Sequence, residues 1–388
     1  MTPATEPAES SEARHRPEAR TDPRTGPEQS RPDRPDGQGE QHHRQDPQDP
    51  RSPQDPQEQQ DPREEQTPRE EQDEQDRHDE QDPYEYQHRQ TFQKTFADPG
   101  PRLIATDLDG TLLRDDKTIS QRTTAALAAA EDAGVEVFFV TGRPLRWMGV
   151  VAQHLAGHGM AIAANGAAVY DLRAGTLIEA FPLPEDDALA IAHALRAAIP
   201  GTTFAIERTF CFRREPGYPP IEADDSLPRA GIEELLAADR GQPLLKLLAK
   251  HPSLDPDEFL ATALTLAGGH GEITRSSESA LLEISGAGVS KATTLAKCCA
   301  ERGVTAAEVV AFGDMPNDLA MLGWAGFPYA VANAHPRVLA ATRYRTGSNN
   351  DDGVARVIER LLAARAERAE RTDRTDRADR ADRTDRLP

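Results

Sequence analysis

The first 91 residues contain no leucine, isoleucine, valine or phenylalanine, and the first leucine of the chain is Leu103. A segment without large aliphatic side chains cannot bury enough apolar surface to offset the entropy lost when its backbone is ordered. Asp-Pro steps and near-repeats of Gln, Glu, Arg and Pro fill this region instead. We therefore predict that residues 1–98 form a disordered, low-complexity tail and that folding is confined to the roughly 265 residues from Pro101 to Ala364.

The C-terminal residues 365–388 repeat an acidic residue followed by arginine every three positions. Opposite charges four residues apart, such as Glu367 and Arg371, support a helix. No apolar stripe gives such a helix a surface to pack against. We expect this charged C-terminal tail to be either a fraying helical extension or disordered.

The charge and composition exclude several classes of protein. The net charge is −21, of which −13 falls within the first 100 residues, so the globular part is mildly acidic and unlike a general nucleic-acid-binding protein. The sequence has no apolar stretch long enough to span a membrane. Its first residues carry no apolar run, so we expect no secretory signal. Three cysteines without metal-ligand spacing fit a reducing compartment. We expect a cytoplasmic protein without nucleic-acid or membrane partners.

Between the tails, short apolar runs alternate with helical patterns. The expected strands are Leu103–Thr106, Val135–Val140, Gly159–Ala164, Val309–Phe312 and Phe327–Val331, and the expected helices are Gln121–Ala133, Lys291–Arg302 and Gly353–Leu362. Strands that alternate with helices over short connections build a parallel sheet covered on both faces. The pattern therefore predicts an α/β fold with a doubly wound, Rossmann-like parallel sheet, formed by residues 99–182 and 288–364.

Residues 183–287 have a different order of expected helices and strands, and they interrupt the alternating pattern of the first sheet. The expected helices here are Glu185–Ala198, Ile232–Ala238 and Asp257–Ala267, and the expected strands are Phe204–Phe212, Leu244–Lys250, Glu272–Arg275 and Leu281–Ser285. This composition predicts a second α/β layer, inserted within the sequence of the first sheet.

The most informative motif, Thr106-Asp107-Leu108-Asp109-Gly110-Thr111, begins where the first strand ends. Open α/β sheets bind ligands at this edge. Asp107 and Asp109 lie two residues apart, so their like charges are costly when they lie close together without a cation. A hard cation such as Mg²⁺ relieves that repulsion and holds a phosphate oxygen. The alternative interpretation is an Asp-Gly turn with solvated acids.

Three more segments offer complementary chemistry. Thr141 ends the second strand, where its hydroxyl could donate to a phosphoryl oxygen or cap the next helix. Lys291 begins a helix and could neutralise a nucleophile and a phosphate, or be an ordinary surface lysine. Asp314 and Asp318 follow another predicted strand and could complete a metal site or cap a loop. The recurrence of suitable groups at four positions favours the chemical interpretation.

These four elements, in this order, resemble the haloacid dehalogenase superfamily of phosphatases, and most closely its Cof-type branch, which carries a large α/β cap between the second and third motifs. The resemblance covers about Arg102 to Leu362, and residues 183–287 lie where the cap domain belongs. Ala164-Asn165-Gly166-Ala167 and Ser348–Ala355 also fit the branch. Ser290 and Ala292 depart from it, because the branch often has Asn or Asp before the motif lysine and Gly after it.

The resemblance implies a Mg²⁺-dependent phosphatase that hydrolyses small phosphorylated metabolites, such as sugar-phosphate-like monoesters, through an aspartyl-phosphate intermediate. Asp107 would be the nucleophile, and Asp109 would be the general acid and then the general base. Mg²⁺ would bind the Asp107 carboxylate, the Asp109 backbone carbonyl and Asp314. Asp318 would bind through water or orient Lys291.

The resemblance also implies which residues meet the substrate. The candidate substrate-binding residues are Thr141, Arg143, Asn165, Lys291 and Asn317. Thr141 and Lys291 would stabilise the transferring phosphoryl group, whereas Arg143 fits a substrate contact and a structural role about equally. The basic cap residues Arg208, Arg213 and Lys246 could contact the leaving group but are more consistent with solvated strand positions.

Two other functions remain open at this stage. A phosphohexomutase-type phosphotransferase would share the aspartyl-phosphate but pass the phosphoryl group to a second hydroxyl. A non-enzymatic protein that recruits partners through its tails would need no catalytic groups, yet none of the expected groups is missing.

Overall fold

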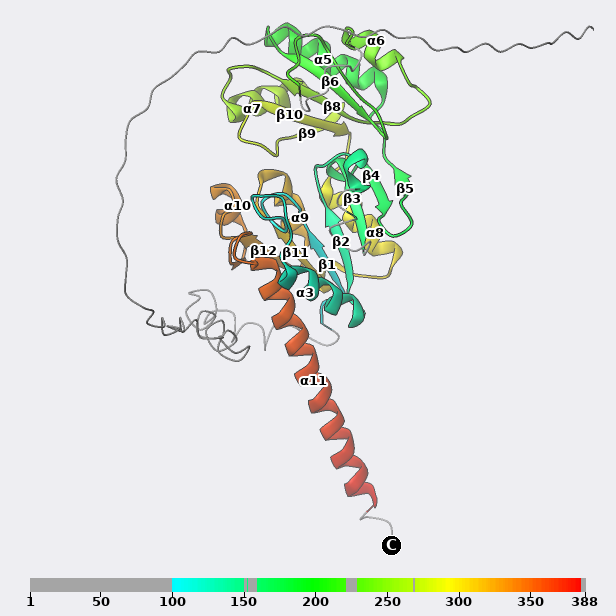
Figure 1. Ribbon diagram of the computed structural model, residues 1–388, viewed down its shortest axis with the longest axis vertical. Helices are drawn as coiled ribbons and strands as arrows, with labels where there is room; N and C mark the ends of the chain where they lie inside the picture. Colours follow the sequence, from blue (N-terminus) through cyan, green and yellow to red (C-terminus); the bar gives the residue numbers. More distant parts are fainter. Residues whose placement is uncertain (1–99, 150–151, 153–158, 221–228, 268, 385–388) are drawn as a thin grey trace, which may run out of the picture. The chain divides into compact units, whose positions relative to one another are not determined.

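The computed structural model describes residues 100–149, 152, 159–220, 229–267 and 269–384 (Figure 1). The predicted N-terminal tail, residues 1–98, lies outside the described residues. Within them, no helix has both the length and the apolar character that crossing a membrane requires.

A mixed sheet of eight strands, counted over the described residues, carries the predicted motifs (Figure 1). Its strand order is β13-β12-β11-β1-β2-β3-β4-β5. The strands are β1 Leu103–Thr106, β2 Glu136–Val140, β3 Met160–Ala163, β4 Ala168–Asp171, β5 Thr176–Ala180, β11 Val309–Gly313, β12 Phe327–Val331 and β13 Tyr344–Thr346. The strands from β13 to β3 pair in parallel, whereas β4 and β5 form an antiparallel hairpin at one edge.

The predicted α/β fold class is therefore confirmed, but the antiparallel edge formed by β4 and β5 was not predicted. The expected central strands coincide with β1, β2, β3, β11 and β12 to within a residue or so. The strands β4, β5 and β13 were not predicted. The edge strand β5 is at best half-buried, and β13 has only three residues, so neither presents the continuous apolar run of a central parallel strand.

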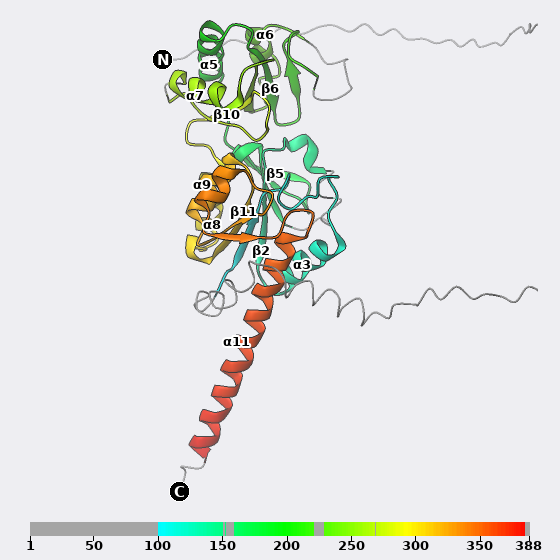
Figure 2. The ribbon, with the colours of Figure 1, turned by 90° about the vertical axis from the view of Figure 1, so that its left-hand side faces the viewer.

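Helices cover both faces of this sheet. They are α3 Gln121–Asp132, α8 Lys291–Glu301, α9 Leu319–Trp324, α10 Pro336–Ala341 and α11 Gly353–Thr384. Figure 2 shows α8 and α9 on one face and α3 and α11 on the other. As predicted, the Ser120 side chain caps α3 by accepting a hydrogen bond from the Thr123 N–H, and Gly134 follows the end of the helix.

The last helix, α11, is longer than the predicted helix and continues to Thr384. Of the two alternatives for the C-terminal tail, the structure has the helical extension. Ion pairs between residues four apart accompany it, from Arg371 to Glu367 and from Arg374 to Glu370. Such exposed pairs each stabilise a helix by about 0.2–0.5 kcal/mol.

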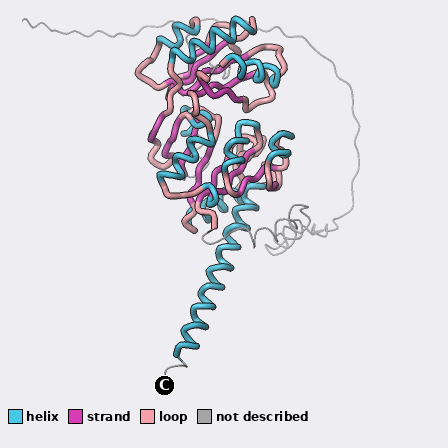
Figure 3. Tube along the Cα trace, turned by 180° about the vertical axis from the view of Figure 1, so that it is seen from behind, coloured by secondary structure: helices cyan, strands magenta, loops and turns pink. Residues whose placement is uncertain are grey.

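The inserted residues form a second sheet, whose strands are drawn in magenta in the upper part of Figure 3. The sheet is antiparallel and has the order β7-β6-β8-β10-β9. The strands are β6 Thr203–Arg208, β7 Phe212–Arg214, β8 Leu244–Lys250, β9 Gly271–Thr274 and β10 Leu281–Gly286, and the helices are α5 Glu185–Ala198, α6 Ile232–Ala237 and α7 Pro256–Leu266. The three helices share one apolar cluster with the side chains of a single face of the sheet. The prediction of one strand over Phe204–Phe212 is wrong, because the chain reverses between β6 and β7, where the Arg208 N–H donates to the Cys211 carbonyl at 2.8 Å.

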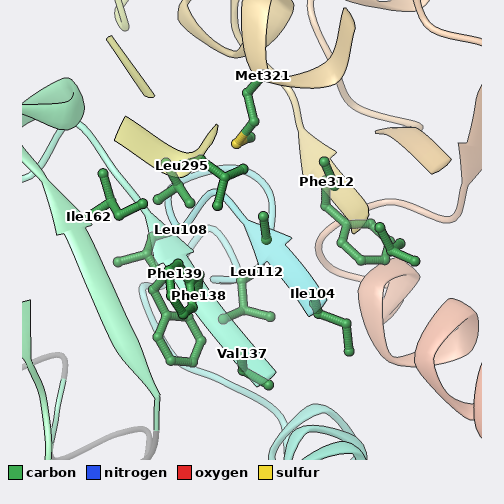
Figure 4. Packing of buried hydrophobic residues seen from close by; sticks show 14 of the residues in the cluster. Ile104, Leu108, Leu112, Val137, Phe138, Phe139, Ile162, Leu295, Phe312 and Met321 are labelled. Carbon is green, nitrogen blue, oxygen red and sulfur yellow. The ribbon is translucent and has the colours of Figure 1, made fainter. Parts of the chain in front are cut away.

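The core of the large sheet is packed on both of its faces (Figure 4). Adjacent residues of a strand point to opposite faces, yet the neighbours Phe138 and Phe139 of β2 are 0% and 1% exposed. Ile162 of β3 and Phe312 of β11 belong to the same cluster. Burial of the central strands on both sides explains why their sequences are continuous apolar runs rather than alternating patterns.

Replacement of Phe138 by alanine should lower the free energy of unfolding by about 3–5 kcal/mol, because it leaves a cavity in a fully buried part of the core. The measurement is denaturant unfolding followed by circular dichroism. Ile178→Ala is the matched control, because Ile178 is 58% exposed on β5 and its loss should change stability by less than about 0.5 kcal/mol. A loss of under about 1 kcal/mol for Phe138→Ala would contradict this description of the core.

Candidate active site

The predicted motifs follow three neighbouring strands, at the carboxyl ends of β1, β2 and β11 in the large sheet. In the register of the sheet, Thr106 at the end of β1 lies between Phe139 of β2 and Phe312 of β11. The Asp107 N–H then donates to the Phe312 carbonyl at 3.0 Å. Because the three strands are parallel, the residues that follow them emerge side by side.

Three buried carboxylates meet at this edge. Asp107, Asp314 and Asp318 each offer one oxygen, and the three oxygens lie within 4.8 Å of one another. The residues are only 6%, 7% and 0% exposed. Burial, together with the neighbouring carboxylates, raises the pKa of Asp107 well above its ordinary value, although Lys291 opposes the shift. Burial and the charge of Asp318 raise the pKa of Asp314 to about 7.

Lys291 lies within this cluster. Its Nζ donates to Asp107 Oδ1 at 2.6 Å and to Asp318 Oδ1 at 2.7 Å, and the residue is 2% exposed. Burial opposes its charge, but the two carboxylates outweigh burial and raise the pKa of the ammonium above its usual value. A capping box of Ser290 and Thr293 starts α8 and so places Lys291 in its first turn. Lys291 is therefore not an exposed surface lysine.

The loop after β11 depends on the second oxygen of Asp318. This Oδ2 accepts hydrogen bonds from the N–H groups of Asp314 and Met315, both at 3.0 Å. Space is tight on both sides of the loop. A Cβ at Gly313 would lie 2.6 Å from the Asp318 Cβ, and a Cβ at Gly110, whose φ is +76°, would lie 2.4 Å from Asp314 Oδ2. These two positions therefore require glycine.

Asp109 lies apart from the three clustered carboxylates. Arg143 binds it through two hydrogen bonds, Nε to Oδ2 at 2.5 Å and Nη2 to Oδ1 at 2.7 Å, and Lys117 Nζ donates to Oδ1 at 3.0 Å. Partial burial opposes ionisation, but these two cations lower the pKa of Asp109. The predicted Asp109 carboxylate and Arg143 are thus partners. Lys117 was not among the predicted site residues, because a lysine in an exposed loop carries no distinguishing pattern.

Thr141 is buried directly after β2. Its Oγ1 accepts a hydrogen bond from the Arg143 N–H at 3.0 Å, and its carbonyl accepts one from the Asn165 N–H at 3.0 Å. Asn317 Nδ2 in turn donates to Asn165 Oδ1 at 3.2 Å. The next helical turn, Leu145–Trp147, has no side-chain cap, so Thr141 does not act as its N-cap.

The Thr111 hydroxyl also contacts the carboxylate cluster and was not predicted. Thr111, which follows the Asp-Gly turn, donates from Oγ1 to Asp314 Oδ1 at 2.8 Å and is 1% exposed. Thr111 was not among the predicted site residues, because nothing in the local pattern indicates a partner 203 positions along the chain.

A cavity of about 350 Å³ lies beside these groups. The loops around the large sheet line it with Asp107, Asp109, Lys117, Thr141, Gly142, Arg143, Pro144, Arg146, Trp147, Met315 and Asn317, and the inserted unit lines it with Glu207, Lys246, Leu248, Ser276, Leu281 and Glu283. Asn165 and Lys291 are outside this lining, although both contact residues within it.

The solvated positions expected for two cap residues are wrong. Lys246 and Arg208 are each 2% exposed. Lys246 lines the cavity, whereas Arg208 binds Glu185 and the carbonyls of Leu236 and Gln242 within the inserted unit. Alternation of polar and apolar residues along a strand marks two faces, but it does not tell which of them meets water.

The chemistry of the cluster suits a hard divalent cation. Mg²⁺ and similar ions take oxygen ligands, and three carboxylates held by a single lysine leave a net negative charge. The raised pKa values of Asp107 and Asp314 report the same repulsion, which a cation would relieve. The buried side chains therefore fit a metal site.

In protein free of metal ions, Asp314→Asn should raise the melting temperature, and more so at about pH 8 than at about pH 5. The pKa of Asp314 is raised in the folded state to about 7, so the stability that its protonation supplies is present at low pH and is lost as the pH rises through that value. Thermal melts in the presence of a chelator at both pH values measure the difference.

Asp132→Asn is the control for this prediction, because Asp132 is exposed at the end of α3 and should respond equally at both pH values. If the difference in melting temperature between Asp314→Asn and the unaltered protein does not grow with pH, the raised pKa of Asp314 in the folded state would be contradicted.

Comparisons with known proteins agree on one family. A family model described as haloacid dehalogenase-like hydrolase matches residues 104–358. The chain is 32% identical over 257 residues to a 5-amino-6-(5-phospho-D-ribitylamino)uracil phosphatase of Bacillus subtilis (strain 168), an alignment that spans 66% of this chain and 94% of that protein. It is 30% identical over 273 residues to a pyridoxal phosphate phosphatase of Escherichia coli (strain K12), spanning 66% of this chain and 97% of the relative.

Solved structures show the same fold. The crystal structure of a haloacid dehalogenase-like hydrolase from Bacteroides thetaiotaomicron aligns with a TM-score of 0.55 and 25% identity, over 67% of this chain and 99% of that one. A sugar phosphatase of haloacid dehalogenase subclass IIB aligns with a TM-score of 0.56 over 66% of this chain and 98% of that one, at 22% identity.

Proposed function

Because the chain belongs to the haloacid dehalogenase-like hydrolases and is a phosphatase, we propose that it hydrolyses phosphate monoesters of small polar metabolites with Asp107 as nucleophile and Mg²⁺ as cofactor. The observation that carries this proposal is the meeting of Asp107 with Lys291 and two further carboxylates at the end of β1. Such a group combines a nucleophile, a fixed positive charge and oxygen ligands for a cation.

The Asp107 and Asp314 carboxylates would hold Mg²⁺, together with the Asp109 backbone carbonyl. When bound, the ion neutralises these carboxylates and the phosphoryl oxygens. Both oxygens of Asp318 already accept hydrogen bonds, one from Lys291 and the other from backbone N–H groups. This supports a role for Asp318 in orienting Lys291 and the loop rather than as a direct ligand.

Asp107 attacks phosphorus, its carboxylate forms an acyl-phosphate bond, and the bond from phosphorus to the leaving oxygen breaks. Lys291 occupies Asp107 Oδ1, so the other carboxylate oxygen is the one available to attack. The Lys291 ammonium and the Thr141 hydroxyl stabilise the charge that develops on the phosphoryl oxygens. Lys291 comes from the first turn of α8, and Thr141 directly follows β2, which pairs with β1.

Asp109 gives a proton to the leaving alcohol and later takes one from the hydrolytic water, whose oxygen attacks phosphorus, breaks the bond from phosphorus to Asp107 and releases inorganic phosphate. Arg143 and Lys117 bind it in the described structure, and both favour its ionised form. An entering phosphoryl dianion competes with Asp109 for these two cations, which weakens their hold and allows Asp109 to carry a proton. Arg143 thereby controls the protonation of Asp109 and also binds the phosphoryl group of the substrate.

The cavity supports a small polar leaving group. Its volume of about 350 Å³ is at the lower end of the range for small-molecule sites. Glu207, Lys246 and Glu283 line one side with charged groups, and Trp147 adds an aromatic surface. The two relatives named above act on phosphate esters of polar ring compounds, so these esters and sugar phosphates form the first substrate panel.

We also propose that the protein works in the cytoplasm. All three cysteines, Cys211, Cys298 and Cys299, are free thiols, and two of them are buried. Free thiols of this kind are usual in a reducing compartment.

Asp107→Asn should lower kcat by about 10³-fold or more, because removal of a nucleophile abolishes the covalent step. The assay is the release of inorganic phosphate from the substrate panel. Asp116→Asn is the control, since Asp116 lies in an exposed part of the loop after the Asp-Gly turn. Unchanged turnover by Asp107→Asn would rule out the proposed mechanism, and bisphosphorylated sugar without free phosphate would indicate phosphotransfer instead.

Removal of divalent ions by a chelator should abolish phosphate release, and added Mg²⁺ should restore it, because the carboxylates and the phosphate otherwise repel one another. Ca²⁺ should restore less activity, since it favours more ligands at longer distances. The readouts are initial rates and the binding of Mg²⁺ by titration calorimetry. Full activity after chelation, with no Mg²⁺ bound, would contradict the cofactor assignment.

A further inference from the structure

One face of the antiparallel sheet carries buried charged side chains beside a small apolar cluster that includes Ala205 and Leu248. Helices α5, α6 and α7 share an apolar cluster with the other face. On the charged face, Glu207 of β6, Lys246 of β8 and Glu283 of β10 come from three adjacent strands. Glu207 and Lys246 are direct cross-strand partners. All three residues are at most 5% exposed, although lysine and glutamate are seldom fully buried.

The ammonium of Lys246 has three hydrogens to donate. Its Nζ donates to Glu283 Oε1 at 2.7 Å and lies 3.8 Å from Glu207 Oε2. These carboxylates compensate for the burial of the charge, which would otherwise be strongly unfavourable. A further bond leaves the inserted unit, because the same Nζ donates to the Gly142 carbonyl at 2.8 Å.

Gly142 stands between Thr141 and Arg143, both candidate phosphate-site residues. A peptide unit is planar, so the Gly142 carbonyl and the Arg143 N–H move as one rigid group. The Arg143 N–H donates to Thr141 Oγ1 at 3.0 Å. Lys246 thus binds the carbonyl of the peptide unit between Gly142 and Arg143, and the N–H of the same unit binds the Thr141 hydroxyl oxygen. With a lone pair occupied in this way, the hydroxyl proton is free to point toward another acceptor.

We propose that Lys246 is a positioning residue for phosphoryl transfer, which orients the Thr141 hydroxyl through the peptide unit between Gly142 and Arg143. This inference rests on the proposed function, since it assumes that Thr141 donates to a phosphoryl oxygen. It assigns the inserted unit a part in binding the phosphoryl group, in addition to enclosing the leaving group.

The position of Lys246 is compatible with two roles, and the two predict a different dependence of turnover on the leaving group. As a residue that lines the cavity, Lys246 could instead bind the leaving group directly. A direct contact would matter only for leaving groups with polar substituents. An effect through Thr141 would lower turnover by the same factor for every ester, because all of them share the phosphoryl group.

The experiment compares Lys246→Met, Lys246→Arg, Thr141→Val and the double variant Lys246→Met/Thr141→Val in the full-length protein with Mg²⁺. Lys246→Met should lower kcat about tenfold, as expected for the loss of one orienting hydrogen bond, on both a sugar phosphate and p-nitrophenyl phosphate. Lys246→Arg keeps a donor and should recover most of that loss. The double variant should be no slower than Thr141→Val alone, because the two residues act in one chain of contacts.

Lys250→Met is the matched control. Lys250 lies on the same strand and face as Lys246, but its Nζ donates to Ser279 Oγ at 2.7 Å within the inserted unit. We expect its kcat and KM to be unchanged. If Lys246→Met does not fold, Lys246→Met/Glu283→Gln removes the buried pair together and keeps the charge balanced, and its kcat should fall by the same factor.

Additive losses in the double variant, or a loss confined to the sugar phosphate, would overturn the inference and leave the proposed function intact. Absence of phosphate release by the unaltered protein on every ester of the panel would instead overturn the proposed function. The two failures are therefore separate results of the same set of assays.

Discussion

The buried contact of the Lys291 ammonium with the Asp107 and Asp318 carboxylates is the interaction on which the rest of the site depends. It joins the residue that follows β1, the first turn of α8 and the loop after β11. One ammonium cannot neutralise the three carboxylates gathered there, and breaking such a buried pair would leave uncompensated charge. The fold therefore holds a negative potential at this edge, which would attract a divalent cation, and the bound cation would in turn offset the repulsion between the carboxylates and a phosphoryl group.

The parallel sheet makes this concentration of charge possible. Hydrogen bonds along β1, β2 and β11 set the register, and the Asp107 N–H bond to the Phe312 carbonyl extends it past the last residue of β1. The apolar core beneath the edge is packed on both faces, so the strands cannot shift to relieve the repulsion. The strain is held in the side chains, as the raised pKa of Asp314 indicates.

The inserted unit contributes charge of its own. Its sheet has one face that shares an apolar cluster with three helices and another that presents Glu207, Lys246 and Glu283 to the cavity. The presence of charged residues within the mostly apolar strands β6, β8 and β10 is readable from the sequence, and this pattern marks two different faces. Its usual interpretation, one face in the core and one in water, fails here because the polar face meets the large sheet at Gly142.

Much of the fold and the chemistry follows from the sequence alone. The absence of large aliphatics before Phe92 predicts that folding is confined to the later part of the chain, and the apolar runs with polar residues at their carboxyl ends indicate a parallel sheet with acids at one edge. Asp107, Asp314, Asp318 and Lys291 could be proposed as a group for that reason. The apolar run of a strand and the polar residues that follow it are local features, so consecutive residues of the sequence are enough to recognise them.

Only the tertiary structure decided the pairings. That Arg143 and Lys117 bind Asp109, that Thr111 binds Asp314 and that Lys246 reaches Gly142 depends on residues up to 203 positions apart. The same applies to the burial of Lys291 and Lys246, because a lysine in a sequence has the same chemistry whether it faces water or two carboxylates. Their roles arise from neighbours that packing brings together, and the sequence does not specify those neighbours one by one.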